Sequence, residues 1–143
     1  MSVREWMTKD PLTVSPQTSV FRAWRVMQER RIKHLPVLDG DRLMGIVSDS
    51  DLRLALPSPA TSLEAHEINY LLDRMTVSEV MAKPVVTVTI STPLQDAAWT
   101  LLRHRIGALP VMEGGALVGI LTRSDVLGSF AAIPVPEAVG TAA

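Results

Sequence analysis

Residues 3–54 are repeated without a gap at residues 77–128, and this internal repeat constrains the fold more than any other feature of the chain. A shift of 74 positions aligns 52 residue pairs, of which 19 are identical. Two copies are too few for a solenoid, and each copy is too short to bury its own apolar faces. We therefore expect both copies to form one domain with a pseudo-twofold axis.

Each copy is predicted to fold as a strand, a helix, a β-hairpin and a second helix. The apolar run at residues 12–14 predicts the first strand, and apolar residues at three- and four-residue spacing predict a helix over residues 20–27. Asp39-Gly40 suits the tight turn of a hairpin. Pro36 and Pro110 are each expected to open a strand, where a missing N–H removes least.

A strand that reaches the next through a helical crossover is usually parallel to it, whereas a hairpin adds an antiparallel strand. The predicted fold class is therefore α/β (α+β), with two β-α-β-β-α repeats whose small mixed sheets pack about the pseudo-twofold axis. The expected divisions are residues 1–57 for the first repeat, 58–76 for a helical bridge, 77–132 for the second repeat and 133–143 for a flexible tail.

The bridge contains the sequence TSLE, in which Thr61 and Glu64 form a predicted capping box at the start of its helix. The last helix of the first repeat is expected to stop before Pro57, and its counterpart in the second repeat to fade at Gly128.

Composition excludes several classes of protein. The chain has 47% hydrophobic and 20% charged residues, and no apolar run approaches the ~18 residues that cross a bilayer. The N-terminal residues lack the apolar segment of a secretory signal, so we expect a cytoplasmic protein with no membrane partner. A net charge of −1 disfavours nucleic acid as a partner, and the absence of cysteine removes disulfides and thiolate chemistry.

The sequences GIVSDSDL and GILTRSDV occupy matching positions, at residues 45–52 and 119–126, where an apolar strand gives way to a helix. One interpretation is a helix cap, because Ser48 with Asp51 and Thr122 with Asp125 each fit a capping box. Another is a ligand site, because a helix start presents amides to an anion and a carboxylate can accept hydrogen bonds from two ribose hydroxyls. The two interpretations are compatible.

No catalytic or metal-binding pattern is visible. His34, His66 and His104 are scattered, and each is more simply explained by a surface or packing role. Nucleophile-elbow and glycine-rich phosphate motifs are absent from the sequence. We therefore expect a protein that is not an enzyme and has no metal site.

The twofold pattern of strand, helix, LPV, hairpin and G-[IL]-[VL]-[ST]-x-S-D resembles a tandem pair of CBS domains, the adenosyl-sensing Bateman module, over residues 2–132. The segment between the copies is similar to stand-alone pairs of the acetoin-utilisation AcuB type. The resemblance implies a regulatory, energy-sensing homodimer that binds AMP, ADP or ATP between its repeats, requires no cofactor and acts on a regulated protein of unknown identity.

The resemblance also implies roles for individual residues. The ribose would be held by Asp51 and Asp125, with Ser48 and Thr122 contacting ribose or phosphate. The adenine pocket would be lined by first-strand residues and by one valine in each LPV sequence, namely Thr13, Val14, Val37, Thr87, Val88 and Val111.

The two copies differ where phosphate is expected. Lys33 and His34 in the first copy align with Gly107 and Ala108, and Arg123 in the second copy aligns with Asp49. Lys33, His34 and Arg123 together would meet the charge of a triphosphate, whereas Asp49 would repel it. A solvated helix end explains Lys33 and His34 equally well. Because the two copies differ at these positions, the sites are expected to be unequal.

Trp24 aligns with Ala98, so the helices of the two copies present different faces, and an unmatched tryptophan can anchor an interface. Two other functions stay open at this point. One is a structural or adaptor protein with empty clefts, and the other is a sensor of S-adenosylmethionine or a dinucleotide.

Overall fold

The computed structural model describes residues 1–56 and 64–134. In chain order its elements are α1 (Val3–Trp6), β1 (Thr8–Lys9), α2 (Val20–Arg30), β2 (His34–Asp39), β3 (Arg42–Ser48), α3 (Asp49–Ala55), α4 (Ala65–Arg74), the 3-10 helix η1 (Val77–Glu79), β4 (Val88–Thr89), α5 (Leu94–His104), β5 (Ala108–Glu113), β6 (Ala116–Thr122) and α6 (Arg123–Ala131).

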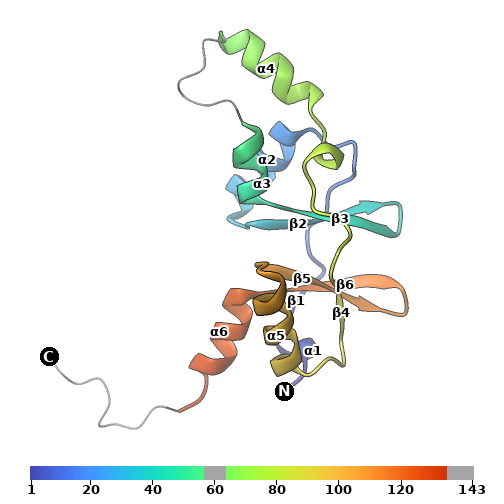
Figure 1. Ribbon diagram of the computed structural model, residues 1–143, viewed down its shortest axis with the longest axis vertical. Helices are drawn as coiled ribbons and strands as arrows, with labels where there is room; N and C mark the ends of the chain where they lie inside the picture. Colours follow the sequence, from blue (N-terminus) through green and yellow to red (C-terminus); the bar gives the residue numbers. More distant parts are fainter. Residues whose placement is uncertain (57–63, 135–143) are drawn as a thin grey trace, which may run out of the picture.

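The two hairpins, β2–β3 and β5–β6, lie in the middle of the molecule, one above the other (Figure 1). Helices α2 and α3 cover the outer side of the first hairpin, and α5 and α6 cover the outer side of the second. Gly40, Gly114 and Gly115 have positive φ angles at the hairpin turns, as the turn sequences predict. The α/β fold predicted from the repeat is confirmed.

The sheets are mixed, as expected. In the second copy β5 pairs antiparallel with β6 and parallel with β4. In the first copy β2 pairs antiparallel with β3, and the predicted strand at residues 12–14 is reduced to a single parallel bridge between Val14 and Val37.

The short segment at the start of each copy, its leading segment, packs on the other copy. Strand β1, near the start of the first copy, pairs antiparallel with β6 of the second, with Thr8 opposite Ile120. Ala82, near the start of the second copy, forms the matching bridge with Ile46 of the first. The buried side chains follow this exchange, because Val3 belongs to the core under α5 and α6 and Val77 to the core under α2 and α3. Each hydrophobic core is therefore completed by the other copy.

The glycine of each G-[IL]-[VL]-[ST] motif makes room for this exchanged segment. A Cβ atom on Gly119 would lie 2.6 Å from Met7 Sδ and 2.9 Å from the Thr8 carbonyl oxygen. A Cβ on Gly45 would lie 2.6 Å from Met81 Sδ and 3.0 Å from the Ala82 carbonyl oxygen. Glycine is needed at both positions because the leading segment crosses the strand at backbone contact.

Several boundaries differ from the predictions. Pro36 and Pro110 are the third residues of β2 and β5 and do not open them. The Pro36 carbonyl accepts from the Val14 amide, so the ring nitrogen faces the same side, away from β3, and its missing N–H removes no bond from the hairpin. Helix α6 continues through Gly128 to Ala131.

The bridge helix α4 begins at Ala65, with Glu64 as its N-cap residue. No side-chain hydrogen bond caps it among the described residues. Thr61, Pro57 and the tail from residue 135 onward lie outside the described part of the chain.

Replacing Gly119 with alanine should lower the free energy of unfolding by about 1–3 kcal/mol, because the new methyl group meets both Met7 and the Thr8 backbone. Gly128→Ala is the matched control. Its Cβ would lie 3.9 Å from Trp6 Cζ3, an ordinary contact, and a helical glycine replaced by alanine gains about 0.5–1 kcal/mol. Urea denaturation of both variants measures the difference. Equal free energies of unfolding for the two variants would show that the leading segment does not require glycine at position 119.

Candidate functional site

Helices α3 and α6 each begin with a reciprocal capping box. The Ser48 amide donates to Asp51 Oδ2 over 2.9 Å, and the Asp51 amide donates to Ser48 Oγ over 3.1 Å. The Thr122 amide donates to Asp125 Oδ2 over 2.8 Å, and the Asp125 amide donates to Thr122 Oγ1 over 3.3 Å. The capping interpretation of the two motifs is therefore confirmed, and it explains a serine or threonine three residues before an aspartate.

The caps leave acceptor capacity unused. Among the described residues, the side-chain hydrogen bonds of Asp51 and Asp125 involve Oδ2 alone. Both aspartates are half-buried, so each residue keeps part of its surface open to solvent. An ionised carboxylate accepts through both oxygens, and a hydroxyl donor can be added without breaking the cap.

The residues just before β2 and β5 are tied to the starts of α3 and α6. The Asp49 amide donates to the Lys33 carbonyl over 2.9 Å, and the Arg123 amide donates to the Gly107 carbonyl over 3.1 Å. Arg123 Nε also donates to the Ile106 carbonyl over 3.2 Å. In each copy the residue that precedes the first hairpin strand is thus held beside the capping box by a backbone hydrogen bond.

His34 of the first copy lies against Gly107 of the second. A Cβ on Gly107 would be 2.8 Å from His34 Nε2 and 4.0 Å from Arg123 Nε. Glycine at position 107 therefore makes room for the imidazole. A large residue of the first copy thus packs against a small residue of the second. The structure brings His34 and Arg123 together although 89 positions separate them in the sequence.

The charges around His34 are mixed. Burial lowers its pKa below the ordinary value, and the nearby charges of Arg123 and Lys33 lower it further. The carboxylates of Asp49 and Asp51 act in the opposite direction but do not compensate for burial. The imidazole is consequently neutral at pH 7. Asp49 is itself paired with Arg53, 2.9 Å away on the next turn of α3.

The predicted adenine-contacting residues are divided by burial. Thr13 and Thr87 are exposed and Val14 is half-buried, but Val88 is only 8% exposed and Val37 and Val111 are completely buried. Val37 and Val111 point to the helices because side chains alternate along a strand. In this structure neither valine has a surface on which a base could pack.

The expectation that the valine of each LPV sequence contacts adenine did not take into account that side chains alternate along a strand. In the hairpins Leu35 and Val37 face the helical core, so His34 and Pro36 face the other way, toward the second copy. The leading segment was also overlooked as part of the site. Thr8 lies opposite Ile120, two residues before Thr122. The sequence held a signal for this segment, because the repeat already begins at residue 3.

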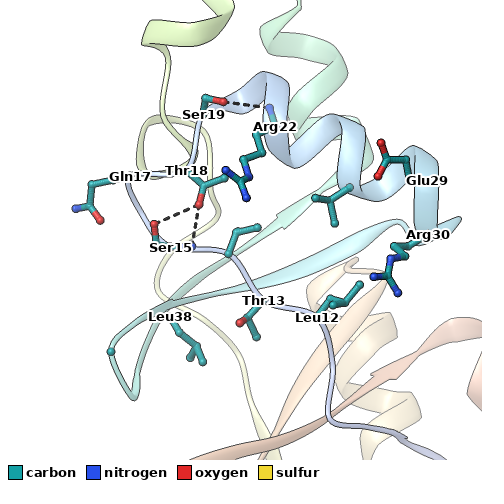
Figure 2. A pocket seen from close by; sticks show the side chains of 13 residues that line it. Leu12, Thr13, Ser15, Gln17, Thr18, Ser19, Arg22, Glu29, Arg30 and Leu38 are labelled. Carbon is teal, nitrogen blue, oxygen red and sulfur yellow. Dashed lines mark hydrogen bonds between the residues drawn. The ribbon is translucent and has the colours of Figure 1, made fainter.

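A separate groove of about 730 Å³ lies on the first copy (Figure 2). Its walls are residues 12–15, the turn into α2, one face of α2 and the hairpin residues Leu38 and Gly40. Thr13 and Val14 line this groove, whereas Ser48, Asp51 and His34 do not. The predicted site residues of the first copy are thus not all gathered in this groove.

Two further features of the described residues bear on ligand chemistry. No cluster of three or more histidine, aspartate or glutamate side chains suited to a metal ion occurs in residues 1–56 and 64–134. Within the same ranges no helix has the length and apolar character needed to cross a bilayer.

The lowered pKa of His34 predicts a pH-dependent stability. As the pH falls below about 6.5, the unfolded chain binds a proton at His34 that the folded chain does not, so the free energy of unfolding decreases until the folded imidazole also titrates. His34→Gln should reduce this decrease. His104→Gln, at an exposed position on α5, is the control and should retain it. Urea titrations from pH 7.5 to pH 5 test this, and parallel curves for the parent chain and His34→Gln would contradict it.

Residues 3–58 and 77–132 each match the CBS domain family. A crystal structure of a putative acetoin utilization protein (AcuB) from Vibrio cholerae is 30% identical and has a TM-score of 0.75, covering 92% of this chain and 90% of that one. CBSX2 in complex with AMP is 35% identical and has a TM-score of 0.76, covering 94% and 99%.

The CBS domain pair of protein MJ0100, in complex with 5′-methylthioadenosine and S-adenosyl-L-methionine, is 26% identical with a TM-score of 0.76, covering 91% of this chain and 99% of that one. CBS pairs of this architecture therefore bind adenosyl ligands of two kinds. With two family matches that together span most of its length and solved relatives that it covers almost completely, the chain belongs to the CBS domain family and contains a pair of CBS domains.

Proposed function

We propose that this CBS pair is a non-enzymatic regulatory module that binds an adenine nucleotide between its two repeats. The observation that carries the proposal is the spare carboxylate oxygen of Asp51 and of Asp125, each held by a helix cap beside the contact between the copies. CBSX2, which is 35% identical over most of the chain, was crystallised with AMP, and this supports the choice of ligand.

In the proposed complex each ribose donates its hydroxyl hydrogen bonds to one aspartate. The caps preorganise both carboxylates, so binding needs little rearrangement there. Thr13, Val14, Thr87 and Val88 are the proposed contacts of the adenine, and Val37 and Val111 support them from the core. Ser48 and Thr122 keep their capping hydrogen bonds, and each hydroxyl group can still donate its hydrogen to the ligand.

The phosphates are proposed to lie near Lys33, His34 and Arg123. Arg123 is exposed, and its Nε–H is already used by the Ile106 carbonyl, which leaves its terminal nitrogens for an anion. Asp49 occupies the corresponding place at the start of α3 and disfavours a phosphate there. We therefore propose unequal sites, with the more highly charged nucleotide at the site that includes Arg123.

Regulation would follow from differential binding. A ligand that contacts both repeats favours one relative orientation of the two and thereby changes the surface offered to a regulated protein. The proposal includes a cytoplasmic homodimer. An adaptor protein with empty clefts is the competing function from another class, and MJ0100 makes S-adenosylmethionine the strongest competing ligand.

Calorimetric titration of the parent chain with AMP, ADP, ATP and S-adenosylmethionine tests the proposal. A nucleotide at a hundred times its dissociation constant should also add about 2.7 kcal/mol to the free energy of unfolding. Flat heat traces and unchanged thermal midpoints with all four compounds would favour the adaptor, and binding of S-adenosylmethionine alone would change the ligand.

Asp125→Asn and Asp51→Asn distinguish the capping role of each aspartate from its proposed role in ligand binding. The amide oxygen can still accept the capping bond, so the free energy of unfolding should change by less than about 1 kcal/mol. Nucleotide affinity should fall about 10-fold or more for the occupied site, because the amide nitrogen cannot accept a ribose hydroxyl. Asp96→Asn, in the first turn of α5 at an exposed position, is the control and should bind like the parent. Unchanged affinity in both site variants would reduce the aspartates to caps.

A further inference from the structure

Five cationic side chains gather where the two copies meet, at the side of the molecule opposite the hairpin turns. Figure 1 shows both turns on the right and the ends of α2 and α5, with the starts of β2 and β5, on the left. The five side chains are all exposed. We call them the basic edge, and they are Arg30, Arg31, Lys33, Arg105 and Arg123.

The basic edge is one surface that both copies share. Arg31 is three residues before His34 and Arg105 is two residues before Gly107, so at most about 11 Å and about 7 Å of chain separate them from the contact between the copies. Arg123 is fixed beside the same contact, because its Nε–H donates to the Ile106 carbonyl. A segment of another molecule could therefore reach cations of both copies at once.

The positive charge of this surface is not neutralised within the described part of the chain. None of the five side chains takes part in a salt bridge there. The neighbouring acids are paired elsewhere, Glu29 with Arg25 at 3.4 Å and Asp49 with Arg53 at 2.9 Å. The basic edge is therefore a local field that an anionic partner could meet.

The net charge of −1 conceals this field because the acids are concentrated elsewhere. Asp39 and Asp41 lie at the turn of the first hairpin, and Glu113 lies at the turn of the second. The molecule is consequently acidic at the turns and basic at the opposite edge.

The backbone at Arg31 and Arg105 indicates that arginine is kept there for a reason other than folding. Both residues end a helix with a φ of 54°, in the left-handed region where glycine is favoured. This conformation lets the next residue turn into the core, and the amides of Ile32 and Ile106 donate to the Met27 and Leu101 carbonyls over 3.1 Å. Glycine would serve the turn better, yet both copies have arginine.

We propose that the basic edge docks a short acidic segment of the regulated partner protein. This deepens the proposed function by giving the chemistry of the partner and the surface that receives it, and it rests on that function only for the existence of a regulated partner. Planar guanidinium groups suit the recognition of carboxylates because each can donate two parallel hydrogen bonds.

The size of the surface favours a peptide over a nucleic acid. An extended segment of about eight residues, at about 3.3 Å each, covers the stretch from Arg31 to Arg105 across the contact. A longer polyanion would continue past the basic edge toward surfaces whose overall charge is negative, and it would be repelled there.

Fluorescence anisotropy with a fluorescein-labelled peptide of eight glutamates tests the proposal, with the full chain at low ionic strength and without nucleotide. The parent chain should bind the peptide, and added salt should weaken the binding. Because no nucleotide is present, a failure here is distinct from a failure of nucleotide binding in the calorimetric titration.

Variants with equal net charge locate the binding surface. Arg31→Gln/Arg105→Gln should raise the dissociation constant of the peptide about 10-fold or more. Arg4→Gln/Arg42→Gln is the matched control, because it removes two exposed charges from α1 and from the first hairpin turn. The control should bind like the parent. Lys33 and Arg123 are left unchanged because the proposed nucleotide site also uses them.

A second pair of variants separates binding from folding. Arg31→Gly/Arg105→Gly should raise the urea midpoint, because glycine adopts a positive φ without steric cost, and should still weaken peptide binding about 10-fold. Arg31→Lys/Arg105→Lys keeps both charges and should restore most of the affinity.

Four results would each overturn the proposal. They are a parent chain that does not bind the peptide, an equal loss of affinity in Arg4→Gln/Arg42→Gln, unchanged affinity in Arg31→Gly/Arg105→Gly, and tighter binding of a thymidine oligonucleotide that carries the same number of charges. The last result would assign the basic edge to nucleic acid.

Discussion

The exchange of leading segments holds this molecule together, and the rest of the structure depends on it. Thr8 pairs with Ile120 and Ala82 with Ile46, so each hydrophobic core contains a valine contributed by the start of the other repeat. The exchange also places the two hairpins face to face, because each leader enters beside the strand that ends in a capping box. The position of the candidate site is therefore a consequence of how the cores are completed.

Pseudo-symmetry of the backbone does not extend to the chemistry. The hydrogen bonds that tie Asp49 to Lys33 and Arg123 to Gly107 are equivalent, yet one joins a lysine to an acid and the other a glycine to an arginine. His34 uses the space that Gly107 leaves, and the reverse contact would put Lys33 near Ala108. A twofold scaffold with unequal side chains at its axis can hold two ligands of different charge, or one ligand in one site.

Much of the fold could be predicted from the sequence because repetition, apolar periodicity and turn chemistry agree with one another. The repeat gave the element order, and the motifs gave both capping boxes with the correct residues. What failed depended on tertiary contacts. Local pattern cannot show that the leading segments are exchanged or that the nitrogen of Pro36 faces away from β3. Alternation along a strand places Val37 with Leu35 on one face, but only the packing of the helices shows that this face is the buried one. The contact of His34 with Gly107 joins residues of different copies, and no local propensity encodes it.

A helix cap and a ligand contact at the same aspartate have different energetic consequences, and this decides where regulation can arise. Because Asp51 and Asp125 hold their caps without a ligand, a nucleotide that binds them gains affinity from a site already in place and changes the helix starts little. A ligand shifts a conformational equilibrium only through contacts that differ between the two states. In this molecule His34 of one copy lies against Gly107 of the other, beside Arg123, and this contact would change if the repeats moved relative to each other. In the proposed function the capping aspartates would thus supply the binding, and the contact between the copies would supply the response to it.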